Sequence, residues 1–185
     1  MQAARGASLN TSDTESTSPS SRRVPPRGVF AAVAIVMLVI DQASKQWALT
    51  ALADKDISVV GDWFTLHLVF NPGAAFGTGT KYTWVFSTLA LIAICVVLYL
   101  SRRIQSTLWA VGLGFLLGGV AGNFIDRLFR DPAPMRGHVV DLFMLPNWPV
   151  FNVADICINI AAGVIILQTF RGINLDGSRH EDDKK

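Results

Sequence analysis

The chain has 185 residues, of which 51% are hydrophobic and only 16% are charged. It is therefore too apolar for an ordinary soluble domain and short enough to form one compact membrane domain. The net charge of +2, without a basic run interleaved with aromatic residues, argues against a nucleic-acid-binding protein. The two cysteines, Cys95 and Cys157, lie apart in apolar runs, so they support neither a disulfide framework nor a zinc site. We expect both to be small core residues.

Residues 1–27 differ in composition from everything that follows. The stretch "SLNTSDTESTSPSSRRVPPR" is rich in Ser, Thr and Pro and almost free of aliphatic residues, which predicts a disordered cytoplasmic tail. Its last arginines precede a short apolar stretch, an arrangement that is also typical of a secretory signal peptide. A first membrane span is favoured instead, because the apolar run continues through Asp41 and three more apolar segments follow.

Four apolar segments are long enough to cross a membrane, which needs about 20 residues. They are residues 28–52, 82–100, 107–125 and 153–170. The third contains a glycine-rich stretch, 112–122, where another helix backbone could approach closely. The predicted fold is therefore mainly helical, with four transmembrane helices.

The loops between the spans indicate orientation and a small sheet. Ten basic residues lie on the side of the termini and five lie in the loops 53–81 and 126–152. This bias predicts that both termini are cytoplasmic and both loops are outside, although three of the five are arginines of 126–152. The first loop contains "ISVVGDWFTLHLVFN", whose β-branched and aromatic residues predict a short hairpin or small sheet at the membrane surface.

Four aspartates share one depth near the predicted outer surface: Asp41, Asp126, Asp141 and Asp155. Asp41 precedes Lys45 by one helical turn, and the simplest interpretation is a structural ion pair. Asp126 is followed by Arg127 and preceded by Asn123, which predicts a polar clasp at a helix end. Both groups have a structural explanation.

The other two aspartates are candidates for chemistry. Asp155 lies in the first turn of the last span and could simply cap that helix. Capping does not explain Asp141, whose neighbours in "HVVDLF" are apolar. Two carboxylates close together in an apolar setting share a proton, so one acts as base and the other as acid, as in aspartic proteases. No Ser/His or Cys/His set competes, because the three histidines, His67, His138 and His180, are expected to be unpaired.

Five motifs occur in the order and approximate spacing of one family: "DQASKQWA", "FNPGAAFG", "GGVAGNFIDR", "GHVVDLF" and "FNVAD". Over about residues 28–170 the chain resembles bacterial lipoprotein signal peptidase, or signal peptidase II. The resemblance implies a four-helix aspartyl protease of the bacterial plasma membrane with a small extracytoplasmic β-cradle. It divides the chain into the tail 1–27, the protease domain 28–170 and a polar cytoplasmic tail 171–185. Such enzymes remove the signal peptide of prolipoproteins by cutting before a cysteine that already carries diacylglyceryl.

The resemblance also implies roles for individual residues. The catalytic pair falls on Asp141 and Asp155. Residues implied to line the substrate groove or to support the pair are Asn71, Gly73, Asn123, Arg127, Asn152, Asp41, Lys45 and Asp126. Without the resemblance, Asn71-Pro72-Gly73 indicates only a turn. The segment 128–136 is longer and 142–151 shorter than in the family pattern, so lid shape and substrate preference are where the chain should differ.

The implied mechanism is general acid–base hydrolysis without a covalent intermediate, a metal or a cofactor. The expected partners are the lipidated prolipoprotein and membrane lipid, with no nucleic acid, and we expect a monomer. Two other classes remain as alternatives. A small transporter or proton channel would spread its charges through the membrane's depth, whereas the middles of spans two and three carry none. A non-enzymatic membrane scaffold would leave Asp141 without a purpose.

Overall fold

The computed structural model describes residues 24–73 and 82–179. Most of the predicted N-terminal tail, the second half of the "FNPGAAFG" motif and His180 lie outside the described residues. The proposed division into a domain and two tails therefore stays a prediction.

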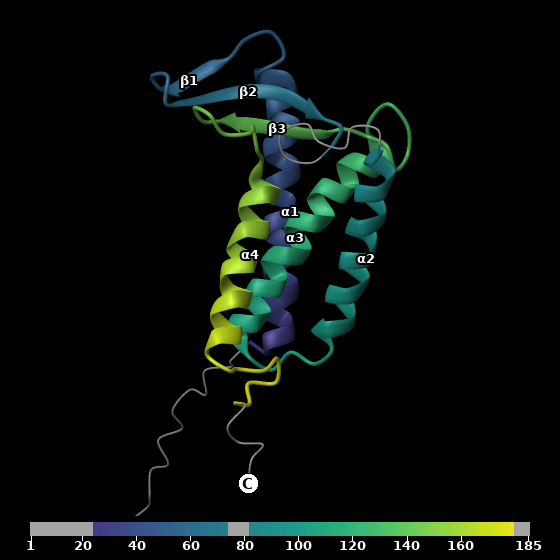
Figure 1. Ribbon diagram of the computed structural model, residues 1–185, viewed down its shortest axis with the longest axis vertical. Coiled ribbons are helices and arrows are strands. Elements are labelled where there is room, and N and C mark those ends of the chain that lie inside the picture. The colour runs from purple at the N-terminus through teal and green to yellow at the C-terminus, as the bar shows by residue number, and fades with distance from the viewer. Residues whose placement is uncertain (1–23, 74–81, 180–185) are drawn as a thin grey trace, which may run out of the picture.

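Four helices form a bundle: α1 (Pro26–Ala51), α2 (Thr83–Ser101), α3 (Thr107–Phe129) and α4 (Val153–Phe170). Each is long and apolar enough to cross a membrane. The prediction of a mainly helical protein with four spans is confirmed, and the helices run roughly side by side (Figure 1). The third helix continues beyond the predicted end at residue 125, so Asp126 and Arg127 lie within it.

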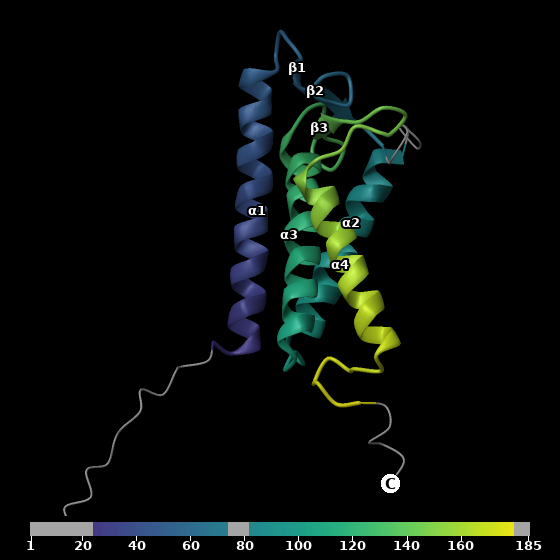
Figure 2. The same ribbon diagram turned by 90° about the vertical axis from the view of Figure 1, so that its left-hand side faces the viewer.

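Helix α3 is the centre of the bundle, because it packs against each of the other three helices (Figure 2). Its glycines make this possible. A Cβ added to Gly118 would lie 2.9 Å from the Ala34 carbonyl oxygen of α1, and one added to Gly119 would lie 2.6 Å from the Ala154 carbonyl oxygen of α4. No side chain fits at such distances, so the close approach predicted for 112–122 is confirmed.

A small antiparallel sheet covers one end of the bundle. Its strands, in the order β1-β2-β3, are β1 (Ile57–Val60), β2 (Phe64–Asn71) and β3 (Val139–Met144). The predicted hairpin is confirmed as β1 and β2. The third strand was not predicted; it brings Asp141 beside Val69 of β2. The sheet thus carries Asp141 to the end of the bundle where α3 ends and α4 begins (Figure 1).

The opposite end is closed by the segment that follows α4. The Leu175 carbonyl oxygen accepts a hydrogen bond from the Gln105 N–H at 3.0 Å, and the Trp109 indole donates to the Ile173 carbonyl oxygen at 2.9 Å. These contacts join the described C-terminal segment to the start of α3. The ends of α1 and α4 that lead to the chain termini are both on this side (Figure 1).

The expectation of two core cysteines is half right. Cys157 is buried where α4 packs on α3, but Cys95 is exposed. The reason is that α2 packs mainly on α3 and presents the rest of its apolar surface outward. An apolar run in a membrane helix does not distinguish the core from the surface facing lipid.

Candidate active site

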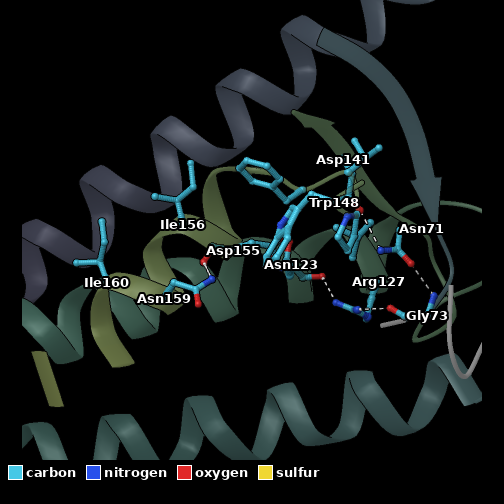
Figure 3. A pocket seen from close by; sticks show the side chains of 14 residues that line it. Asn71, Gly73, Asn123, Arg127, Asp141, Trp148, Asp155, Ile156, Asn159 and Ile160 are labelled. Carbon is cyan, nitrogen blue, oxygen red and sulfur yellow. Dashed lines mark hydrogen bonds between the residues drawn. The ribbon is translucent and has the colours of Figure 1, made fainter. Parts of the chain in front are cut away.

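Asp141 and Asp155 line the same cavity, which has a volume of about 500 Å³ (Figure 3). Asp141 comes from the middle of β3, and Asp155 from the first turn of α4. The two carboxylates therefore reach the cavity from different layers, the sheet and the bundle. The structure brings together the pair that the sequence singled out.

Asn152 connects the two carboxylates. Its side-chain Nδ2 donates to Asp141 Oδ1 at 2.6 Å, while its backbone N–H donates to Asp155 Oδ2 at 3.1 Å. In return, the Asp155 N–H donates to Asn152 Oδ1 at 3.0 Å, which completes a capping box at the start of α4. The capping interpretation of Asp155 is therefore right, and it does not compete with the site. The same bonds that begin the helix fix its carboxylate beside Asp141.

Asp141 is almost completely buried, with 2% of its surface exposed. Its second oxygen, Oδ2, accepts a hydrogen bond from Asn71 Nδ2 at 2.9 Å. Burial raises the pKa of this carboxyl from 3.8 to about 6; the Asn71 hydrogen bond opposes the rise, and the charge of Asp155 adds to it. A carboxyl of this kind holds a proton at a pH where an exposed aspartate has lost it.

The segment Asn71–Gly73 forms another part of the cavity wall. It folds as the tight turn that its sequence predicted. Asn71 Oδ1 accepts the Gly73 N–H at 3.0 Å, and the Gly73 carbonyl oxygen accepts from the Arg127 guanidinium at 3.2 Å. Arg127 also reaches the Asn123 carbonyl oxygen at 3.3 Å (Figure 3). Its Nε is buried and has no partner among the described residues. Arg127 thus ties α3 to the turn after β2 and keeps one donor beside the cavity.

Below the cavity lies a buried group of charges centred on Lys45. Its Nζ contacts Asp41 Oδ2 at 2.9 Å and Asp126 Oδ2 at 2.8 Å, and all three side chains are fully buried. The predicted Asp41–Lys45 pair is confirmed. Lys45 also donates to Asn123 Oδ1 at 2.8 Å, and Asn123 Nδ2 donates to Asp155 Oδ1 at 3.1 Å. The residues expected to support the pair are therefore joined to it through Asn123.

The predicted clasp between Asp126 and Arg127 is wrong. Asp126 instead contacts Lys45 and, through its other oxygen, Arg130 Nε at 2.7 Å. The reason is helical geometry: α3 includes these positions, and residues one apart on a helix do not face each other, whereas residues four apart do. Arg127 is left free to turn towards the cavity.

Comparison with known proteins places this architecture in one family. The family model described as signal peptidase (SPase) II matches residues 33–171, which is most of the chain. The chain belongs to the signal peptidase II family. It is therefore an aspartic-type peptidase, and a multi-pass membrane protein.

Individual relatives agree with this assignment. The lipoprotein signal peptidase of Mycobacterium leprae (strain Br4923) is 42% identical over 156 residues, covering 83% of this chain and 78% of the relative. That of Leifsonia xyli subsp. xyli (strain CTCB07) is 39% identical over 183 residues, covering 97% and 85%. A solved bacterial membrane enzyme, determined at 2.3 Å resolution, has the same fold, with a TM-score of 0.70 and 23% identity over 85% of this chain and 92% of that one.

Sequence reasoning missed part of the cavity of this signal peptidase II. Its apolar and aromatic wall is formed by Trp148, Phe151, Ile156 and Ile160, with Asn159 among them. Helical spacing from Asp155 could have found Asn159, which lies four residues further on and on the same face of α4. Ile156 and Ile160 are also four residues apart, on the neighbouring strip of the helix. No signal marked Trp148, which belongs to the turn after β3.

Of the described residues, the histidines His67 and His138 do not line the cavity. His67 was expected to be unpaired, which is wrong: its Nδ1 lies 2.7 Å from Asp56 Oδ1. Both side chains are exposed on the sheet side of the molecule, and neither lines the cavity of Asp141. Within residues 24–73 and 82–179, no group of His, Cys, Asp and Glu could hold a metal ion.

Proposed function

We propose that this signal peptidase II removes the signal peptide of diacylglyceryl-modified prolipoproteins, cutting before the lipidated cysteine, with Asp141 and Asp155 as its catalytic pair. The observation that carries the proposal is the placement of two carboxylates on one cavity, held by a single residue, Asn152. The family membership supports the reaction. The geometry supports the choice of residues.

The division of labour follows from exposure. Asp155 is half-buried on the cavity wall, where a water molecule can reach it, so it acts as the general base. Asp141 is buried and its pKa is raised to about 6, so it holds the proton and donates a hydrogen bond to the scissile carbonyl oxygen. The attacking water gives its proton to Asp155, and the proton then passes to the leaving amine.

The remaining site residues position the substrate and the pair. Asn71 and Asn152 each hold one oxygen of Asp141, so they fix the plane of its carboxyl group. Arg127 and the Gly73 backbone form the wall where the substrate peptide binds, and the Arg127 guanidinium is held there by the Gly73 and Asn123 carbonyl oxygens. Asp41, Lys45 and Asp126 act at a distance, by holding α1 and α3 together beneath the site.

The orientation is proposed from the charges. The end of the bundle that carries Arg102, Arg103 and Arg171 is placed in the cytoplasm, because basic residues favour that side. The sheet and the catalytic cavity then lie at the outer face of the bacterial plasma membrane, and both termini are cytoplasmic. The substrate's acyl chains stay among membrane lipids, and one copy of the chain carries a complete site.

The test is cleavage by the purified protein in lipid vesicles. The substrate is a prolipoprotein that carries diacylglyceryl on its cysteine, and the control is the same prolipoprotein without the lipid. The expected product of the first begins with the lipidated cysteine, and the control should stay intact. Folded protein that leaves the lipidated substrate uncut would contradict the function. Normal cleavage by Asp141→Asn or Asp155→Asn would contradict the assignment of the pair.

A further inference from the structure

One polar residue of the cavity has no place in the mechanism above. Asn159 lies on α4 four residues after Asp155 and lines the same cavity (Figure 3). Its neighbours on that wall are Ile156 and Ile160, which are 40% and 42% exposed. An amide here stands within a membrane-spanning helix, on a strip that is otherwise apolar. Polar groups at such positions are expensive and mark functional surfaces.

The Asn159 amide keeps a free donor. Its Nδ2 donates to the Asp155 carbonyl oxygen at 2.8 Å, which uses one of its two N–H groups. The second N–H and Oδ1 have no partner among residues 24–73 and 82–179, although the side chain is exposed to the cavity. Anchored in this way, the amide has a fixed direction and one donor to offer a ligand.

The position of this donor matches one part of the substrate. Four residues of α-helix correspond to about 6 Å, so Asn159 lies one turn further along α4 than Asp155, away from the sheet. The lipidated cysteine follows the scissile bond directly, and its glycerol begins within a few bonds of it. The two ester groups join the glycerol to the acyl chains. Each ester carbonyl is a hydrogen-bond acceptor and carries no donor, so it needs a partner such as an N–H.

We propose that Asn159 donates a hydrogen bond from Nδ2 to an ester carbonyl oxygen of the diacylglyceryl group. This proposal rests on the function proposed above and adds a specificity residue to it. Ile156 and Ile160 then lie on either side of the acyl chains where these leave the glycerol. The site thereby recognises the ester linkage of the lipid as well as its apolar length.

A purely structural role is the competing explanation, and α4 offers a matched control for it. Thr169 also donates to the carbonyl oxygen four residues earlier, Ile165, at 2.8 Å. It is exposed and lies near the other end of the helix, away from the cavity. Thr169→Val therefore removes the same kind of bond from the same helix without touching the site.

The experiment uses two substrates with the same peptide, one with a diacylglyceryl cysteine and one with the dialkyl ether analogue, which lacks both carbonyl oxygens. The enzyme is the full chain in lipid vesicles, as parent, Asn159→Leu and Thr169→Val. Leucine matches the shape of asparagine and removes its donors. The parent should have a kcat/KM about 3- to 10-fold higher for the ester, because one neutral hydrogen bond is worth about that factor. Asn159→Leu should abolish this preference, so that its kcat/KM values for the ester and the ether become equal.

Every other outcome overturns the proposal. An equal loss on both substrates would mean that Asn159 contacts the peptide or only supports Asp155. If the parent enzyme has no preference for the ester, the Asn159 amide does not recognise the ester linkage. The same conclusion holds if Asn159→Leu keeps the preference. Thr169→Val should behave like the parent on both substrates, and an ester-specific loss there would equally contradict the assignment. Failure of the parent to cut either substrate would instead contradict the proposed function.

Discussion

The buried carboxyl of Asp141 should make the folding stability depend on pH in a way that one substitution removes. The folded protein raises its pKa from 3.8 to about 6. Below pH 3.8 the group is protonated in both the folded and unfolded states and costs nothing. Between pH 3.8 and about 6 the unfolded state loses this proton while the folded state keeps it, so stability falls as the pH rises. Above about pH 6 both states are ionised, and the loss is complete. At 1.36 kcal/mol for each pKa unit, the full loss above that pH is about 3 kcal/mol.

Asp141→Asn removes the ionisable group and keeps the shape of the side chain. The free energy of unfolding of the variant, relative to that of the parent, should therefore rise by about 3 kcal/mol from pH 4 to pH 8. For a chain of this length, this corresponds to about 6–12 °C in Tm. The measurement is thermal unfolding of both purified proteins in the same detergent at a series of pH values. The difference between the two Tm values cancels the other groups that titrate in that range.

Asp126→Asn is the matched control, because it is an equally buried aspartate with cationic partners. Its carboxylate contacts Lys45 at 2.8 Å and Arg130 at 2.7 Å, so its loss takes one of two carboxylates from the buried Lys45 and separates Arg130 from its ion-pair partner, at a cost of up to about 3–5 kcal/mol. This variant should melt below the parent at pH 8 and keep measurable turnover in the folded fraction. The reasoning about Asp141 is refuted if its variant and the parent differ by the same Tm at pH 4 and pH 8. The reasoning about Asp126 is refuted if its variant melts like the parent yet is inactive.

Three further outcomes are expected. Asp141→Asn and Asp155→Asn should each lower kcat by about 10²–10⁴-fold in membranes while the protein stays folded, and near-normal turnover would remove that residue from the mechanism. In a background without Cys95 and Cys157, an impermeant thiol reagent added to intact cells should label a cysteine at Ser58 and not one at Asp176; the reverse pattern would overturn the orientation. Deletion of residues 1–20, with the following arginines retained, should preserve turnover and orientation, because the composition of this segment cannot support a packed element; a large loss in correctly inserted protein would show a role in catalysis.

The sequence was sufficient to predict the elements whose signal is local. Apolar length predicted the four helices, and β-branched and aromatic residues predicted the hairpin. The strand β3 has a weaker local signal, because only six residues, Val139–Met144, form it and the residues of β2 with which they pair lie about 70 to 80 positions earlier. The resemblance to signal peptidase II selected Asp141 and Asp155, but it could not show that a strand and a helix carry them to one cavity.

The ion-pair partners of the charged residues were harder to predict than the depth of these residues in the membrane. Asp126 was assigned to its neighbour in sequence, Arg127, and the structure pairs it with Lys45 on another helix. The partners of a buried charge depend on which helices meet, and that depends on the glycines of α3. A Cβ at Gly122 would lie 2.3 Å from Asp41 Oδ2, so only glycine lets the Asp41 carboxylate lie against α3.

The same buried charges determine the direction of two of the amides around the catalytic pair. Lysine can only donate hydrogen bonds, so Lys45 requires the oxygen of the Asn123 side chain to face it. The Asn123 NH₂ group must then point the other way, and it donates to Asp155. Asn152 Nδ2 also reaches Asn123 Oδ1, at 3.2 Å, and thereby presents its NH₂ group to Asp141. A cation buried at 0% exposure thus orients two amides so that their donors converge on both carboxylates. An apolar core of equal stability could not orient these amides. The buried ion cluster gives the two carboxylates one consistent set of hydrogen-bond partners, and the open side of the pair faces the cavity.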